Sequence, residues 1–382
     1  MDHSTAIHAR TADAGMLATL LEATRTRTLR LLDTYVAALG PSLAVPYSPQ
    51  LNPPMWEAGH VAWFQEWWIG RNRQRMTGIA CDPDHARPAS LVAEADALYN
   101  SSLVAHAARW HLPLPGLAAT RDYLAASLEQ SLALLAAETT DDALYFYRLS
   151  LFHEDMHGEA AIYMAQALDI DLPHDLRPAQ SALPAPAVLA LPAQRWRLGH
   201  DGAGFAFDNE CPAHDVDIAA TDIDAVPVSW RRYVEFMEAE RVAPPRYLRR
   251  GGDGWQMRRY GAWQSLALDA PACHLTWPEA DAWCRWAGRR LPDEAEWEAA
   301  ALTLPSFAWG HVWEWTASRF LPFDGFIAHP YRDYSAPWFG ERYVLRGASG
   351  ATSPRMAHPR YRNFFTPERN DIHAGFRSCA AR

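Results

Sequence analysis

The chain has 382 residues, of which 49% are hydrophobic and 21% are charged, and its formal net charge is -10. This length and composition are typical of a globular protein with two domains. The acidic balance argues against nucleic acid as a partner, because such binding depends on neutralising phosphates with basic side chains. All 35 lysine-plus-arginine residues are arginine, which excludes Schiff-base chemistry and a P-loop.

The N-terminus has no charged-then-apolar signal, and no uninterrupted run of about 18 apolar residues occurs, so we expect a cytoplasmic protein without a membrane partner. The five cysteines are odd in number and form no CxxC pair. They favour buried thiols over a disulfide framework or a thiolate zinc site. The sequence leaves the oligomeric state open.

From about Thr11 to Leu168, apolar side chains recur at intervals of three and four, the spacing of amphipathic helices. Helices of this kind pack as a bundle. We therefore expect a four-helix bundle over residues 1–172, with an ordered loop between its second and third helices. The helices are expected near residues 16–32, 56–73, 120–137 and 142–168.

Residues 173–192 are rich in proline, which blocks helix propagation, and they are interpreted as a linker. Beyond it the helical period fades, and an irregular α+β domain is expected over residues 193–382. Its helices are predicted at 230–240 and 276–288. Between the loops lie short non-helical stretches at 195–199, 214–218 and 343–347.

The most informative motif is HEDMHGE, residues 153–159. His153 and His157 are four residues apart in a helix-forming run, so both imidazoles lie on one face, close enough to bind one metal ion. His60, in a second amphipathic helix, is the best candidate for a third ligand, and three imidazoles leave coordination positions open. Glu159 lies off the shared face, so we expect it to orient an imidazole.

The same motif also satisfies HExxH, the zinc-protease signature, in which Glu154 would be the general base. The context does not support this hydrolase alternative. No histidine occurs six residues after His157, and a proline-rich linker follows the helix in place of a second ligand helix. A zinc hydrolase is therefore a remote alternative.

With His60 and HEDMHGE placed, the N-terminal half resembles the DinB-like bundle of the ergothioneine-type sulfoxide synthases. The second half resembles their formylglycine-generating-enzyme-like domain, which has a C-type-lectin-like fold. The motifs that carry this resemblance are FAFDNECPAHDVDI, HLTWPEADAWCRWAGRRLPDEAEWEAAA, HVWEWTASRF, YVLRGASGAT and RNFFTPERNDIHAGFRSC.

This resemblance implies Fe(II) held by His60, His153 and His157, with hercynine and O2 as substrates. In the family, the imidazole carbon between the two nitrogens of hercynine becomes bonded to sulfur. A quaternary ammonium cannot donate a hydrogen bond and needs aromatic faces. Asn363 and Phe364 match the positions that the family places against the trimethylammonium group.

The chain also departs from the family pattern. Met156 replaces a polar residue that contacts hercynine in some relatives, and Phe323 or Phe326 stands where a proton-donating tyrosine is expected. Tyr331 and Tyr334 are close in sequence and are the candidate replacements for that proton donor.

The ergothioneine branch captures γ-glutamylcysteine with an arginine in the loop before the third helix and an acid after the asparagine-aromatic pair. Here the loop reads RWHLPLPG, and Phe365 takes the place of the acid. Without these charges a buried anionic substrate would be costly. The resemblance is therefore closest to the selenoneine synthase branch, in which a selenosugar forms a carbon–selenium bond with hercynine.

Two other functions stay open. The first alternative is an ergothioneine-type sulfoxide synthase that uses a thiol, and the second is a non-catalytic binding module built on the lectin-like domain. The binding module would consume no oxygen in the presence of hercynine, whereas either enzyme would.

Overall fold

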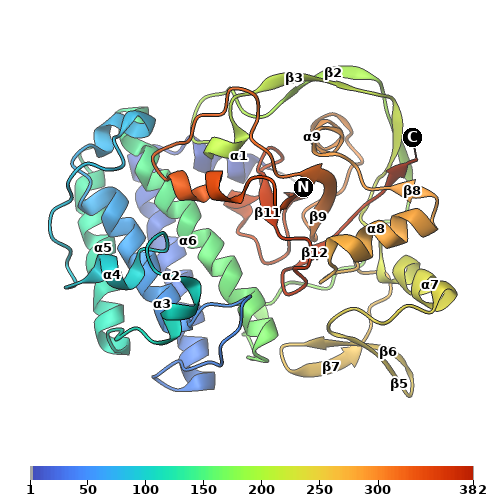
Figure 1. Cartoon of the computed structure of the whole chain (residues 1–382), viewed down its shortest axis with the longest axis horizontal. Helices are drawn as coiled ribbons and strands as arrows, with labels where there is room; N and C mark the ends of the chain where they lie inside the picture. The colour runs from blue at the N-terminus through green and yellow to red at the C-terminus, as the bar shows by residue number, and fades with distance from the viewer. Residues whose placement is uncertain (1–2, 382) are drawn as a thin grey trace.

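The computed structural model describes residues 3–381, and the first half of this range forms the expected four-helix bundle (Figure 1, left). Asp13 and Thr140 cap the first and last long helices with side-chain oxygens that accept backbone N–H groups of the first turn. The four long helices are α2 (Ala14–Leu39), α3 (Pro54–Gln65), α5 (Leu117–Leu135) and α6 (Asp141–Ala167).

The loop between α3 and α5 is ordered, as predicted, and consists of short helical turns. A π-helical turn continues α3, so this helix runs close to the expected end at residue 73. The turns are η1 (Glu66–Gly70), η2 (Arg75–Ala80), α4 (Ala95–Tyr99) and η3 (His106–Trp110).

Two four-stranded sheets organise the second domain (Figure 1, right). All neighbouring strands are antiparallel except β9 and β12. One sheet has the order β1 (Val188–Leu191), β4 (Thr221–Asp224), β13 (Cys379–Ala380) and β8 (Arg289–Arg290). The other has the order β11 (Asn363–Phe365), β10 (Tyr343–Gly347), β9 (Trp313–Arg319) and β12 (Ala374–Gly375).

The remaining strands form two smaller antiparallel sheets, and the second of these sheets lies at the lower edge of the molecule in Figure 1. The first pairs β2 (Gln194–Leu198) with β3 (His214–Ile218). The second contains β5 (Leu248–Gly251), β6 (Gly254–Arg259) and β7 (Ala262–Ser265). Single 3-10 turns occur at η4 (His174–Leu176), η5 (Asp208–Glu210), η6 (Arg332–Tyr334), η7 (Ala336–Trp338) and η8 (Pro354–Met356).

The described part of the second domain also contains three α-helices, of which the sequence predicted two, α7 (Trp230–Glu240) and α8 (Trp277–Trp286). The third, α9 (Glu294–Thr303), was not expected. Its central residues, including Trp297 and Glu298, are buried on several faces, so the helix has no amphipathic period to detect.

The proline-rich segment also differs from the expectation. Within residues 173–192, β1 pairs with β4 residue by residue, so this end of the segment belongs to the second domain. Its VLAL sequence is a short apolar run, and only the pairing with a strand 30 residues further along makes it a strand.

The two domains share one buried apolar cluster, which extends from Leu151 in α6 to Trp315 in β9. At the N-terminus, α1 (Ser4–Arg10) packs on the second domain through a buried ion pair between Arg10 and Glu210, at 2.6 Å. The junction between the domains is therefore packed in the way a core is. Within residues 3–381, no helix combines the length and apolarity needed to cross a membrane.

Candidate metal centre

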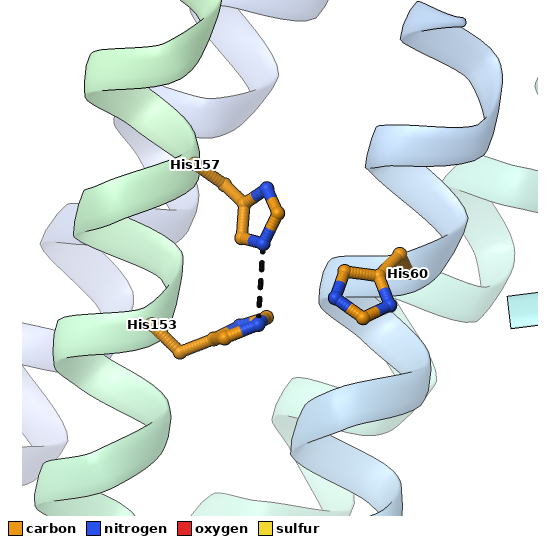
Figure 2. Close-up of side chains that lie close together, drawn as sticks. All are labelled: His60, His153 and His157. Atoms are coloured by element: carbon orange, nitrogen blue, oxygen red, sulfur yellow. Dashed lines mark hydrogen bonds between the residues drawn. The ribbon is translucent and has the colours of Figure 1, made fainter. Parts of the chain in front are cut away.

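Three histidine rings meet between α3 and α6 (Figure 2). His60 comes from α3, and His153 and His157 come from successive turns of α6. The Nε2 atoms of His153 and His157 are 3.2 Å apart, and one ligand atom from each of the three rings lies within 4.8 Å of the others. Among the described residues this is the one cluster of three or more histidine, cysteine or acidic side chains that is close enough to hold a metal ion.

The surroundings fix the orientation of each ring. The Nδ1–H of His60 donates to the carbonyl of Tyr99 at 2.8 Å. His153 is stacked on Phe64, with the ring centroids 3.5 Å apart. His60 is stacked on Trp56 at 4.7 Å. These contacts leave the Nε2 atoms facing one another, as a metal site requires.

Burial also controls the charge of the rings. Burial, and then the neighbouring His157, lowers the pKa of His60 to about 3. Burial likewise lowers the pKa of His153 well below its usual range. Neutral imidazoles have free lone pairs, and they are suitable ligands for iron. The donor set therefore fits the Fe(II) that the family resemblance implies.

The acid that contacts an imidazole is Glu57 in α3, which sequence reasoning missed. Its carboxylate accepts the Nδ1–H of His157. Burial alone would raise the pKa of Glu57, but its electrostatic interaction and hydrogen bond with His157 lower it to about 2. The available signal was the spacing, because Glu57 precedes His60 by three residues and so shares its helix face.

Glu159 has a different position from the one expected. It contacts no imidazole, and its carboxylate accepts hydrogen bonds from Trp313, Ser349 and Thr352 of the second domain, at 2.7 to 2.8 Å. Two residues beyond His157, the helix has turned this side chain away from the other rings and toward the domain junction. Glu159 therefore connects the domains.

A cavity of about 560 Å³ opens beside the three imidazoles, with walls from both domains. Besides the three histidines, four side chains that the sequence singled out border it, and they come from α6, the loop that contains η6, and β11. They are Met156, Tyr331, Tyr334 and Phe364.

The other predicted substrate residues have different surroundings. Asn363 uses its Oδ1 to accept the backbone N–H of Phe364, at 2.9 Å. Side chains alternate along a strand, so Asn363 and Phe365 face away from the side on which Phe364 meets the cavity. Phe326 packs on Phe339, and Phe323 lies under the guanidinium of Arg362.

Tyr334 forms a hydrogen-bonded pair with Tyr361, a residue that the sequence analysis did not single out. The hydroxyl groups of Tyr334 and Tyr361 are 2.9 Å apart, and the Tyr361 hydroxyl also donates to Sδ of Met156, at 3.4 Å. Burial raises the pKa of Tyr331 and of Tyr334 above the usual range. Both are therefore protonated phenols at neutral pH.

Arg109 corrects the reading of the loop before α5. This residue begins the RWHLPLPG segment, where no substrate-binding arginine was expected, yet the turn η3 places its guanidinium in the cavity wall. The guanidinium lies 3.9 Å from the ring centroid of Trp56 and donates to Asn52 at 2.8 Å. Its Nε has no hydrogen-bond partner, and in the described part of the chain its other nitrogens donate to Asn52 and to the carbonyls of Ser101 and Val104, not to a carboxylate.

Comparisons with known proteins match both halves of the chain. Residues 20–165 match the DinB superfamily, and residues 174–308 and 307–382 match the sulfatase-modifying factor enzyme 1-like domain. A hercynine oxygenase of Mycobacterium tuberculosis is 31% identical over 94% of this chain and 97% of its own length. The hercynine oxygenase of Mycolicibacterium smegmatis is 30% identical over the same shares. A formylglycine-generating enzyme of Streptomyces coelicolor is 26% identical over 53% of this chain and 94% of its own.

Proposed function

The chain belongs to the hercynine oxygenase family, and from this membership we propose that it is a nonheme iron oxygenase that acts on hercynine. The observation that carries the proposal is the cluster of three imidazoles on the wall of a cavity between the two domains. Fe(II) held by His60, His153 and His157 would supply the redox chemistry with dioxygen that forms a bond to an unactivated ring carbon.

The proposed reaction joins hercynine to a thiol. The imidazole C–H bond and the S–H bond break, a carbon–sulfur bond forms, and dioxygen contributes one atom to the sulfoxide and one to water. All four electrons that reduce dioxygen come from the two organic substrates, so the reaction needs no external reductant. The chain's own residues bind and orient these substrates and supply protons.

Aromatic side chains in the cavity wall suit hercynine. Its trimethylammonium group is attracted by aromatic faces, and Tyr334, Trp338 and Phe364 border the cavity. Asp333 adds a carboxylate to the same wall. Phe364 is itself held in place by stacking on Phe320 at 4.0 Å. These contacts would hold the ammonium end and leave the imidazole ring free to face the histidine cluster.

Arg109 favours a thiol that carries a carboxylate as the second substrate. A guanidinium recognises a carboxylate with two parallel hydrogen bonds, and among the described residues that of Arg109 donates to an amide and to backbone carbonyls but to no acid. The argument for a neutral selenosugar was based on the absence of such an arginine and of an acid at the position of Phe365, and Arg109 removes the first of these two grounds. Together with the names of the relatives, Arg109 therefore supports the sulfoxide synthase over the selenoneine synthase.

Product analysis tests this function and its second substrate. Protein loaded with Fe(II) is incubated with hercynine, O2 and, separately, γ-glutamylcysteine, cysteine, a thiosugar or a selenosugar, and the products are weighed by mass spectrometry. We expect a hercynyl sulfoxide and a preference for a carboxylate-bearing thiol. Preference for the selenosugar would establish the selenoneine branch, and absence of product from every donor by iron-loaded protein would overturn the function.

A variant pair isolates the role of Arg109. With Fe(II) at a saturating concentration, Arg109→Met is expected to raise the KM for γ-glutamylcysteine at least about tenfold and to leave the thiosugar reaction unchanged, because only the former loses a charged hydrogen bond. Arg121→Met is the matched control, since Arg121 pairs with Asp33 on the outside of the bundle. A rise in the KM for hercynine with both donors would instead assign Arg109 to the hercynine carboxylate.

A further inference from the structure

A chain of hydrogen bonds connects Arg109 in the cavity wall to His157 in the metal centre. Nη1 of Arg109 donates to Oδ1 of Asn52 at 2.8 Å. The amide of Asn52 donates in turn to Oε1 of Glu57. Oε2 of Glu57 accepts the Nδ1–H of His157. Two intermediate residues thus join a substrate-cavity arginine to a candidate metal ligand.

In each of these three hydrogen bonds, only one of the two groups can be the donor. An arginine has donors and no acceptor, so the Asn52 oxygen must face Arg109 and its NH2 must face Glu57. An ionised carboxylate only accepts, so Nδ1 of His157 must carry the proton. Nε2 of His157 is then left with a lone pair, and this atom faces His153.

The relay is also shielded from water. The side chain of Glu57 is 13% exposed and that of His157 is 21% exposed. The other side of the pair borders an apolar pocket lined by residues such as Leu31, Val61 and Met164. A hydrogen bond in such surroundings is stronger than one in water, and its loss is not made good by solvent.

We propose that Asn52 and Glu57 are positioning residues, which form a relay of fixed polarity that holds His157 in its Nδ1–H form and makes metal affinity depend on Arg109. This inference rests on the proposed function only in treating the three imidazoles as a metal site. A carboxylate that engages Arg109 would draw its donor away from Asn52. Occupancy of the cavity and binding of the metal are therefore thermodynamically linked.

Titration with Co(II), followed by its visible absorption, tests the relay without turnover. Glu57→Gln must place an NH2 group against either Asn52 or His157, so we expect Co(II) affinity to fall about 10- to 100-fold. Arg109→Met and Asn52→Leu should each lower it by about 3- to 10-fold. Arg109→Lys keeps a donor for Asn52 and should stay within about twofold of the parent protein.

The double variant distinguishes a relay from general damage. If Arg109 acts through Asn52, Arg109→Met has no further effect on Co(II) affinity once Asn52→Leu is present. Additive losses, or unchanged affinity in Glu57→Gln, would overturn the relay. If Asn52→Leu fails to fold, Asn52→Ala takes its place in the same cycle.

Glu66→Gln is the matched control for Glu57→Gln. Glu66 continues the same helix and is buried, but its carboxylate accepts from Ser90, Leu91 and Tyr123 and contacts no imidazole. The Glu66→Gln variant should bind Co(II) as tightly as the parent protein does. A loss of Co(II) affinity equal to that in Glu57→Gln would show that any such substitution in this helix has the effect. Because no product is measured, failure of the relay and failure of the proposed carbon–sulfur chemistry are separate results.

Discussion

The carboxylate of Glu159 accepts the indole N–H of Trp313 at 2.7 Å and so joins the helix of the metal centre to the central sheet of the second domain. Ser349 and Thr352 donate to the same carboxylate. Burial raises the pKa of Glu159, and these donors oppose that rise by stabilising the ionised form. This group of contacts lies one helical turn from the cavity and keeps its two walls together.

Removal of the Glu159 carboxylate should therefore destabilise the fold without emptying the metal centre. Glu159→Ala leaves buried donors of Trp313 and Ser349 without their acceptor, and we expect the free energy of unfolding to fall by about 3 kcal/mol. Iron content per folded chain should be unchanged. Urea unfolding and metal analysis check the two parts, with the exposed Glu22→Ala as control. Loss of iron at unchanged stability would return Glu159 to the role of orienting an imidazole.

Metal should stabilise the protein through all three histidines. At a free Co(II) concentration of about 100 times the dissociation constant, binding to the native state adds about 2.7 kcal/mol to the free energy of unfolding. We expect His153→Ala to abolish this gain. The exposed His174→Ala should keep it. Thermal unfolding of both variants with and without Co(II) measures this stabilisation. If Co(II) stabilised His153→Ala as much as the parent protein, His153 would be excluded as a ligand.

Tyr331 and Tyr334 both border the cavity, and Tyr334 is the stronger candidate for the proton donor because its hydroxyl is hydrogen-bonded to that of Tyr361, which can return a proton to it. General acids contribute about 10²- to 10⁴-fold, so Tyr334→Phe should lower kcat by at least about 100-fold at unchanged hercynine KM. Tyr361→Phe should have a smaller effect. Single-turnover rates measure this, with the exposed Tyr47→Phe as control. A large loss in Tyr331→Phe alone would assign the proton to Tyr331.

A buried histidine outside the metal centre should make stability depend on pH. Burial lowers the pKa of His274 from 6.5 to about 4. Between these values the unfolded chain binds the proton and the native protein does not, so stability is lost as the pH falls from 6.5 toward 4. At about 1.4 kcal/mol per pKa unit, the contribution is about 3 kcal/mol.

His274→Asn tests this dependence, because asparagine does not titrate and tolerates the positive φ of 61° at this position. In metal-free protein, the free energy of unfolding of the parent should fall by about 3 kcal/mol more than that of the variant when the pH is lowered from 7 to 4. Urea unfolding at several pH values measures it. A constant difference would show that His274 titrates alike in the folded and unfolded chains.

The sequence alone determined the features that depend on local spacing. His153 and His157 lie on one helix face because they are four residues apart, and this holds wherever the helix packs. The capped and amphipathic helices α7 and α8 were predictable for the same reason. The bundle and the lectin-like half followed from motifs whose order along the chain resembles that of a known family.

Only the tertiary structure decided which side chains meet at the site. Glu57 reaches an imidazole 100 residues away, and Arg109 enters the cavity wall, because the packing of α3, α6 and the loop before α5 brings them there. The spacing of the motif suggested an imidazole as the partner of Glu159, whereas in the folded protein its carboxylate accepts hydrogen bonds from the second domain. Contacts between distant segments depend on how whole elements pack, and a local pattern of residue types does not encode that packing.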